Sequence, residues 1–205
     1  MCQEVYELVQ EIGLERLELQ LVLQCAPLLT GLKASNLLIV KPVHKSLIYE
    51  LCRETGLSCF KLGEQMDRVV YLLFDQEALA RSLSQEAVQK LLQDYGYEVK
   101  APVQESLMRF RRHYASYRIG QQGFPHEMGV FLDYPTEDVE GFIQNAGKNF
   151  LFSGYWKVYA NVPKKRRLFQ LFDQAERRLT RSLSAGVKLT DAVKNCKLEL
   201  QKAAV

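Results

Sequence analysis

The chain has 205 residues, of which 47% are hydrophobic and 25% are charged, and its formal net charge is +3 at pH 7. This balance is typical of a folded globular protein and excludes a low-complexity or strongly charged disordered chain. No apolar run approaches the roughly 18 residues of a membrane span, the five cysteines include no CxxC pair, and the acidic N-terminus resembles no signal peptide. We therefore expect a cytoplasmic protein with reduced thiols.

Helical and strand patterns alternate along the first part of the chain, where apolar spacings of three and four predict helices and short apolar runs predict strands. The first three predicted elements are a helix over 14–28 closed by Pro27 and Gly31, a strand over 36–40, and a helix over 44–55 stopped by Gly56. They are followed by strands over 57–62 and 68–74 joined by a hairpin loop over 63–67, a helix from 76 capped by Asp75, and helices over 85–95 and 102–118.

The second part of the chain predicts a strand over 128–132, a helix over 137–145 capped by Thr136, a strand over 152–159, a long amphipathic helix over 168–183, and a last helix capped by Thr190. Strands interleaved with helices indicate an α/β or α+β fold, here a single domain over 1–205 with a mixed β-sheet of about five strands flanked by helices. Residues 1–162 would form the mixed core. Residues 163–205, with eleven Lys and Arg against four Asp and Glu, would form a basic C-terminal helical pair.

His126 and Glu127 stand directly before the predicted strand at 128–132 and are candidate catalytic residues. A His beside a Glu can act as a general acid or base, as a metal ligand, or as an ion-paired structural element. The segment is not HExxH, because position 130 is Val, and one His with one Glu is too few ligands for zinc. We therefore expect no metal site, and both the catalytic and the structural interpretation stay open.

Cys25 is the third candidate catalytic residue and lies on the apolar stripe at the end of the first predicted helix. A helix N-terminus would lower the pKa of its thiol, whereas a C-terminus would not, so a small buried hydrophobe is the alternative interpretation. Lys33 and Asn36, which follow the same helix, are candidate ligand-binding residues.

A segment rich in aromatic residues follows the predicted helix over 137–145. Its glycines fit neither GxGxxG nor the P-loop pattern. Lys148 is a candidate contact for an anion, and Tyr155 and Trp156, which is the only Trp, could stack on a planar ligand or face a helix in the core.

Two basic clusters, Arg109–Arg118 and Lys164–Arg167, combine cations with neighbouring aromatic residues. Such clusters are typical of surfaces that bind RNA or phosphorylated ligands, and equally of solvated helix faces. No RRM, KH or zinc-finger signature accompanies them, so nucleic-acid binding is kept only as an alternative.

Four motifs carry a family resemblance that spans nearly the whole chain. They are Cys25-Ala26-Pro27-Leu28-Leu29-Thr30-Gly31-Leu32-Lys33 with Asn36-Leu37, Pro125-His126-Glu127-Met128-Gly129-Val130-Phe131-Leu132 with Tyr134-Pro135, Asp138-Val139-Glu140-Gly141-Phe142-Ile143, and Gly154-Tyr155-Trp156-Lys157-Val158-Tyr159. At these residues the sequence resembles a bacterial family, found mainly in anaerobic Firmicutes, known as domain of unknown function 3793. The resemblance implies no activity, cofactor or binding residue.

The leading hypothesis is a small ligand-binding or regulatory protein with a pocket between Cys25 and the His126-Glu127 loop. The first alternative is an enzyme using His126 as acid or base, with Glu127 or Asp133 as partner and Cys25 nearby. Polyanion binding through Arg109–Arg118 and Lys164–Arg167, and a homodimer built by the C-terminal helices, are the others. The sequence identifies no cofactor.

Overall fold

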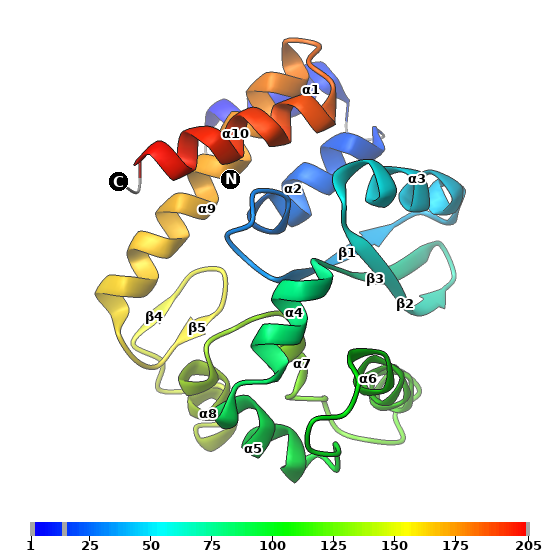
Figure 1. Ribbon diagram of the computed structural model, residues 1–205, viewed down its shortest axis with the longest axis vertical. Helices are drawn as coiled ribbons and strands as arrows, with labels where there is room; N and C mark the ends of the chain where they lie inside the picture. The colour runs from blue at the N-terminus through cyan, green and yellow to red at the C-terminus, as the bar shows by residue number, and fades with distance from the viewer. Residues whose placement is uncertain (1–2, 14–15, 204–205) are drawn as a thin grey trace.

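The computed structural model describes residues 3–13 and 16–203, which form an α+β fold (Figure 1). The N-terminal half contains α1 (Gln3–Ile12), α2 (Leu17–Leu29), β1 (Ser35–Val40), a 3-10 turn (Pro42–His44), α3 (Lys45–Thr55), β2 (Ser58–Gln65), β3 (Arg68–Phe74), α4 (Gln76–Leu83) and α5 (Glu86–Asp94). The C-terminal half contains α6 (Val103–Arg118), α7 (Met128–Phe131), α8 (Thr136–Gln144), β4 (Phe152–Ser153), β5 (Lys157–Val158), α9 (Val162–Ser184) and α10 (Leu189–Ala203).

The five described strands form two small antiparallel sheets rather than the one mixed sheet that we expected. The larger sheet has the order β1-β3-β2, and the smaller one pairs β4 with β5. Strand β2 runs on to Gln65 through an irregularity between Lys61 and Gly63, so the predicted hairpin loop shortens to a turn at Met66 and Asp67. Met66 takes a positive φ of 48° in this turn.

The three-stranded sheet is covered by helices on both faces, as Figure 1 shows. On one face, residues of β3 such as Tyr71 and Leu73 pack into a core with α2, α3, α9 and α10. On the other face, Val70 and Leu72 pack into a second core with α4, α5 and α6. A strand buried on both faces needs apolar residues at successive positions, which explains why β3 is a continuous apolar run.

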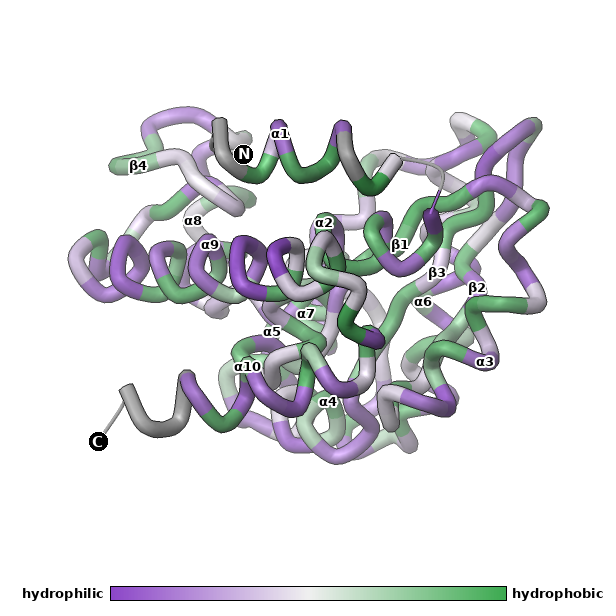
Figure 2. The backbone as a smooth tube through the Cα atoms, turned by 90° about the horizontal axis from the view of Figure 1, so that it is seen from above, coloured by the Kyte–Doolittle hydropathy of each residue, from purple (hydrophilic) through white to green (hydrophobic). Residues whose placement is uncertain are grey.

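Helix α9 runs from beside the β4–β5 hairpin to α10 (Figure 1). It packs against α1, α2 and α10, and Figure 1 shows it passing beside the β4–β5 hairpin. Figure 2 shows hydrophilic and hydrophobic residues alternating along α9, as expected for an amphipathic helix. Its N-terminal half contributes Phe169 and Phe172 to an aromatic core, and its C-terminal half contributes Leu179 and Leu183 to the core that includes α2.

Several local predictions are confirmed. The Asp75 side chain caps α4 by accepting a 2.8 Å hydrogen bond from the Ala78 amide. Gly56 ends α3 in the left-handed conformation, with a φ of 71°. Pro27, in contrast, lies inside α2, and Thr136 and Thr190 are helical residues rather than caps. The Leu14 end of the first predicted helix lies outside the described residues.

The predicted strand over 128–132 is wrong, because α7 is a one-turn helix in which the Leu132 amide donates to the Met128 carbonyl. A Cβ on Gly129 would lie 2.8 Å from Val139 Cγ2, so glycine lets α7 approach α8 closely. The predicted strand over 152–159 is two two-residue strands instead, because the chain reverses between Ser153 and Lys157.

Candidate functional site

Asp138, in the first turn of α8, organises the segment that follows it. The residue is 2% exposed, and Oδ1 accepts hydrogen bonds from the amides of Tyr159 (2.8 Å) and Ala160 (3.2 Å). Oδ2 accepts a 2.8 Å hydrogen bond from Trp156 Nε1 and lies 3.4 Å from Lys165 Nζ. One buried carboxylate therefore holds the β4–β5 hairpin and the start of α9 against α8.

A cavity of about 280 Å³ lies beside this carboxylate, and we call it the His126 cavity. Its lining comes from the loop before α7, from α7 and α8, and from the β4–β5 hairpin. The His126 ring lies between Phe124 and Phe142, with centroid distances of 5.5 and 5.7 Å. Tyr134 stacks on Trp156 at 4.8 Å and lines the cavity with it. The cavity is thus bounded mainly by ring faces and edges, as in sites for planar ligands.

His126 brings an unsatisfied polar atom to this aromatic environment. Its Nδ1 is enclosed and has no hydrogen-bond partner among the described residues. A buried polar atom without a partner costs about 1–3 kcal/mol. Because Nδ1 has almost no accessible surface, a ligand in the cavity can bond to it only after the His126 ring or a neighbouring side chain moves. Lys157, which also lines the cavity, is already engaged: its Nζ donates to the Gly147 carbonyl at 2.7 Å and lies 5.6 Å from the Phe142 ring centroid.

Glu127 is bound elsewhere, although it follows His126 directly. Its side chain is buried, and Oε1 lies 2.6 Å from His113 Nδ1 and accepts a 3.4 Å hydrogen bond from the Tyr97 hydroxyl. Burial, together with the Glu127 charge, raises the pKa of Tyr97. The histidine that pairs with Glu127 is therefore His113 on α6, and the structure contains no His126–Glu127 hydrogen bond.

Cys25, Lys33 and Asn36 form a separate buried cluster where α2 meets β1. Cys25 is 0% exposed, and burial raises the pKa of its thiol to about 12, although the nearby Lys33 lowers it. Burial lowers the pKa of Lys33 to about 8, while Asp133 and Cys25 act in the opposite direction. Lys33 Nζ donates to Asn36 Oδ1 at 2.7 Å. A fully enclosed thiol with a raised pKa favours the interpretation of Cys25 as a small core hydrophobe.

The cluster meets the His126 cavity at Tyr134. Lys33 Nζ lies 5.0 Å from the centroid of the Tyr134 ring, and that ring lines the cavity. Cys25, Lys33 and Asn36 do not line it themselves. Asp133 links the chain before β1 to α4, because its carboxylate accepts hydrogen bonds from the Ala34 amide and from the Ser82 hydroxyl.

Of the candidate residues from the sequence, the cavity brings together His126, Tyr155 and Trp156. Lys148 is exposed and does not line it. Among the lining residues that the sequence did not single out are Phe124, Tyr134, Phe142 and Lys157. They come from two loops, a helix and a strand, so no single periodicity connects them, and the local density of aromatic residues was the only signal.

The two basic clusters do not form one surface of free cations. In the first, Arg109 lies over the Tyr97 ring and Arg111 over the Phe60 ring. In the second, Lys165 is buried and paired with Glu137 and Asp138, while Arg166 lies over Phe152. Several of these cations therefore interact with aromatic rings or carboxylates of the protein itself.

Among residues 3–13 and 16–203, no three His, Cys, Asp or Glu side chains gather as metal ligands would, and no helix is long and apolar enough to cross a bilayer. A family model described as "Protein of unknown function (DUF3793)" matches residues 21–193. Comparison with curated proteins and with solved structures gives no match.

Proposed function

We propose, for a chain that belongs to the DUF3793 family, that it binds a small, flat and mainly apolar ligand in the His126 cavity. The observation that carries this proposal is the enclosed Nδ1 of His126, which has no partner among the described residues and stands between two aromatic rings. After a rotation of the His126 ring that turns Nδ1 toward the cavity, a ligand with one hydrogen-bonding group would satisfy this atom, while its ring would pack against Trp156, Tyr134 and Phe142.

The size of the cavity limits the ligand. At about 280 Å³ it lies just below the roughly 300–1,000 Å³ of ordinary small-molecule sites, so a molecule with one or two rings fits better than a nucleotide. Mainly apolar walls with a few polar groups are the usual composition of such sites, because burial supplies affinity and the polar groups fix orientation.

Trp156 makes the proposal directly measurable, because it is the only Trp and lines the cavity. We would titrate the protein with benzoate, phenol and benzylamine, which present an anionic, a neutral and a cationic group on one ring, and record Trp emission excited at the long-wavelength edge. Saturable binding of at least one probe is expected. His126→Phe keeps the ring contacts but removes the anchor, and should weaken that probe about tenfold, which corresponds to about 1.4 kcal/mol.

His44→Phe is the matched control, because His44 also has an enclosed ring nitrogen without a partner among the described residues but does not line the cavity. It should leave the affinity unchanged. No saturable response to any probe at about 10 mM, or equal affinities in wild type and His126→Phe, would overturn the proposal; 10 mM corresponds to only about 3 kcal/mol of binding free energy.

A further inference from the structure

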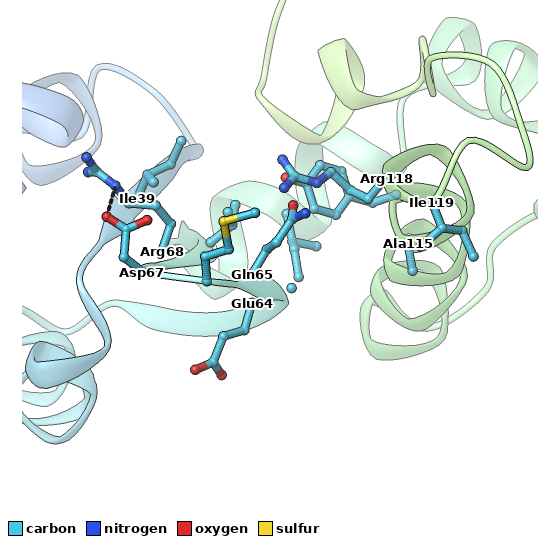
Figure 3. A pocket seen from close by; sticks show the side chains of 13 residues that line it. Ile39, Glu64, Gln65, Asp67, Arg68, Ala115, Arg118 and Ile119 are labelled. Carbon is cyan, nitrogen blue, oxygen red and sulfur yellow. Dashed lines mark ion pairs between the residues drawn. The ribbon is translucent and has the colours of Figure 1, made fainter.

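A second hollow lies between the tip of the β2–β3 hairpin and the C-terminal end of α6, and we call it the hairpin groove (Figure 3). Its volume is about 650 Å³, and it shares no lining residue with the His126 cavity. No residue of the two sequence clusters around Cys25 and His126 reaches it. The groove is therefore independent of the function proposed above.

The floor of the groove is apolar. Ile39, Leu62 and Val70 present it from three neighbouring strands, and Tyr114 and Ala115 form the wall from α6. Tyr114 packs over Gly63 of β2, where a Cβ would lie 3.4 Å from the Tyr114 ring, an ordinary van der Waals contact. Since α6 ends at Arg118, the outer part of this sheet face has no helix over it within the described parts of the chain.

Exposed apolar side chains surround this floor. Met66 is 90% exposed, Ile119 69% and Ile39 40%, and all three line the groove. Single exposed apolar residues are ordinary on protein surfaces, whereas several that converge on one hollow indicate a binding surface.

Three of the four charged residues that line the groove, Glu64, Asp67 and Arg68, have an ion-pair partner. Arg68 pairs with Asp67 at 3.6 Å, as the dashed line in Figure 3 marks, and Glu64 pairs with Lys45 and Lys61. Arg118 forms no ion pair with any residue in the described parts of the chain. Figure 3 shows its side chain extending from the end of α6 toward the hairpin. The groove therefore offers an apolar floor and one cation at its rim.

We propose that the hairpin groove binds an amphiphilic carboxylate, an unbranched acyl chain that ends in a carboxylate group. The chain would lie over Ile39, Leu62 and Val70, and the carboxylate would accept hydrogen bonds from the Arg118 guanidinium, whose planar fork matches a carboxylate. The groove should prefer an anionic amphiphile to a cationic one, because the head group of a cationic amphiphile would be repelled by the Arg118 guanidinium.

The test uses isothermal titration calorimetry with hexanoate, octanoate and decanoate below their micellar concentrations. Affinity should rise with chain length by up to about fourfold for each added methylene, which follows from about 0.8 kcal/mol per buried methylene. Octanol, which has the tail without the charge, should bind about tenfold more weakly than octanoate. Equal affinity across the series, or equal affinity of octanol and octanoate, would overturn the proposal.

Two variants locate the ligand. Arg118→Gln should weaken decanoate about tenfold, with Arg112→Gln, an exposed residue of the same helix, as the control that does not change it. Ala115→Trp places a large ring on an exposed helical position in the groove and should abolish decanoate binding, while an unchanged circular dichroism spectrum shows that the variant folds. Decanoate affinity that survives both changes would refute the assignment.

Two further measurements distinguish the hairpin groove from the His126 cavity and from a lipid-binding surface. His126→Phe should leave decanoate binding intact, so the two proposed sites can fail independently. Sedimentation with phosphatidylcholine vesicles containing phosphatidylglycerol distinguishes free carboxylates from a lipid surface. Binding to vesicles without binding to monomeric decanoate would overturn the proposal in favour of a membrane surface.

Discussion

Replacing Asp138 with Ala is the sharpest test of how the segment around the His126 cavity is held. The substitution removes the acceptor for Trp156 Nε1 and for the Tyr159 and Ala160 amides, and it removes one of the two carboxylates near the buried Lys165. Hydrogen bonds to a charged group contribute about 1.5–3 kcal/mol each, so a simple sum of the three exceeds about 4 kcal/mol.

The expected loss is smaller than that sum, because neighbouring interactions are not additive and Lys165 keeps its 2.6 Å contact with Glu137. We expect Asp138→Ala to lower the free energy of unfolding by about 4 kcal/mol, near the lower end of that sum. Asp138→Asn keeps one oxygen for the two backbone amides, while its amide group cannot accept from Trp156. We expect it to cost about 2 kcal/mol, the range of one or two lost hydrogen bonds.

Urea unfolding followed by far-ultraviolet circular dichroism measures both losses, with Asp67→Ala as the control. Asp67 is exposed and pairs with its neighbour Arg68, so its removal should change stability by less than about 0.5 kcal/mol. The emission of the single Trp should also change in folded Asp138→Ala. A loss below about 1 kcal/mol for Asp138→Ala, or one equal to that of Asp67→Ala, would refute the organising role of this carboxylate.

Three further predictions concern the other buried groups. His113→Ala should cost about 3 kcal/mol in urea unfolding, because it leaves the Glu127 carboxylate buried without its 2.6 Å partner; a change below about 1 kcal/mol would contradict this. Iodoacetamide should modify the half-buried Cys59 in the native protein and spare Cys25, because burial raises the pKa of the Cys25 thiol to about 12. Peptide mass spectrometry measures both modifications, and faster alkylation of Cys25 than of Cys59 would contradict the prediction. Burial lowers the pKa of Lys33 from 10.5 to about 8, so between these pH values the unfolded chain binds more protons than the folded one. As pH rises from 8 to 10.5, the unfolding free energy of the wild type should therefore increase by up to about 3 kcal/mol relative to that of Lys33→Met. A difference between the two unfolding free energies that stays constant with pH would refute this.

The sequence predicts elements whose own residues determine their structure. β3 is apolar at successive positions because both faces of the sheet are covered, and α9 keeps a helical period over its whole length. The run Met128–Leu132 contains no such information, since a short apolar run fits a strand as well as one turn of helix. The helical turn is accompanied by a close approach of Gly129 to Val139 on α8, a contact with a residue outside the run that is visible only in the folded chain.

The candidate site divides in the same way. His126 and Trp156 were both identifiable from sequence as residues that the fold did not obviously need, and the cavity brings them together. The sequence could not show that His126 and Glu127 have different partners. Adjacent side chains point in different directions wherever the backbone turns between them. Here Glu127 turns to His113 in α6, fourteen residues earlier in the chain.

Glycine, proline and aromatic residues are concentrated between Phe124 and Tyr159, and the shortness of several elements there gives a physical reason. A four-residue helix and two two-residue strands have little internal hydrogen bonding, so their positions depend on close contacts with neighbours. A side chain on Gly141 would overlap the Tyr159 ring, and one on Gly154 would overlap Phe169. Together with the Asp138 carboxylate, these contacts fix the walls of the His126 cavity before any ligand arrives, and preformed walls reduce the ordering cost of binding. Substitutions at these glycines should therefore weaken the binding of an aromatic probe at His126 while leaving decanoate binding near Arg118 unchanged.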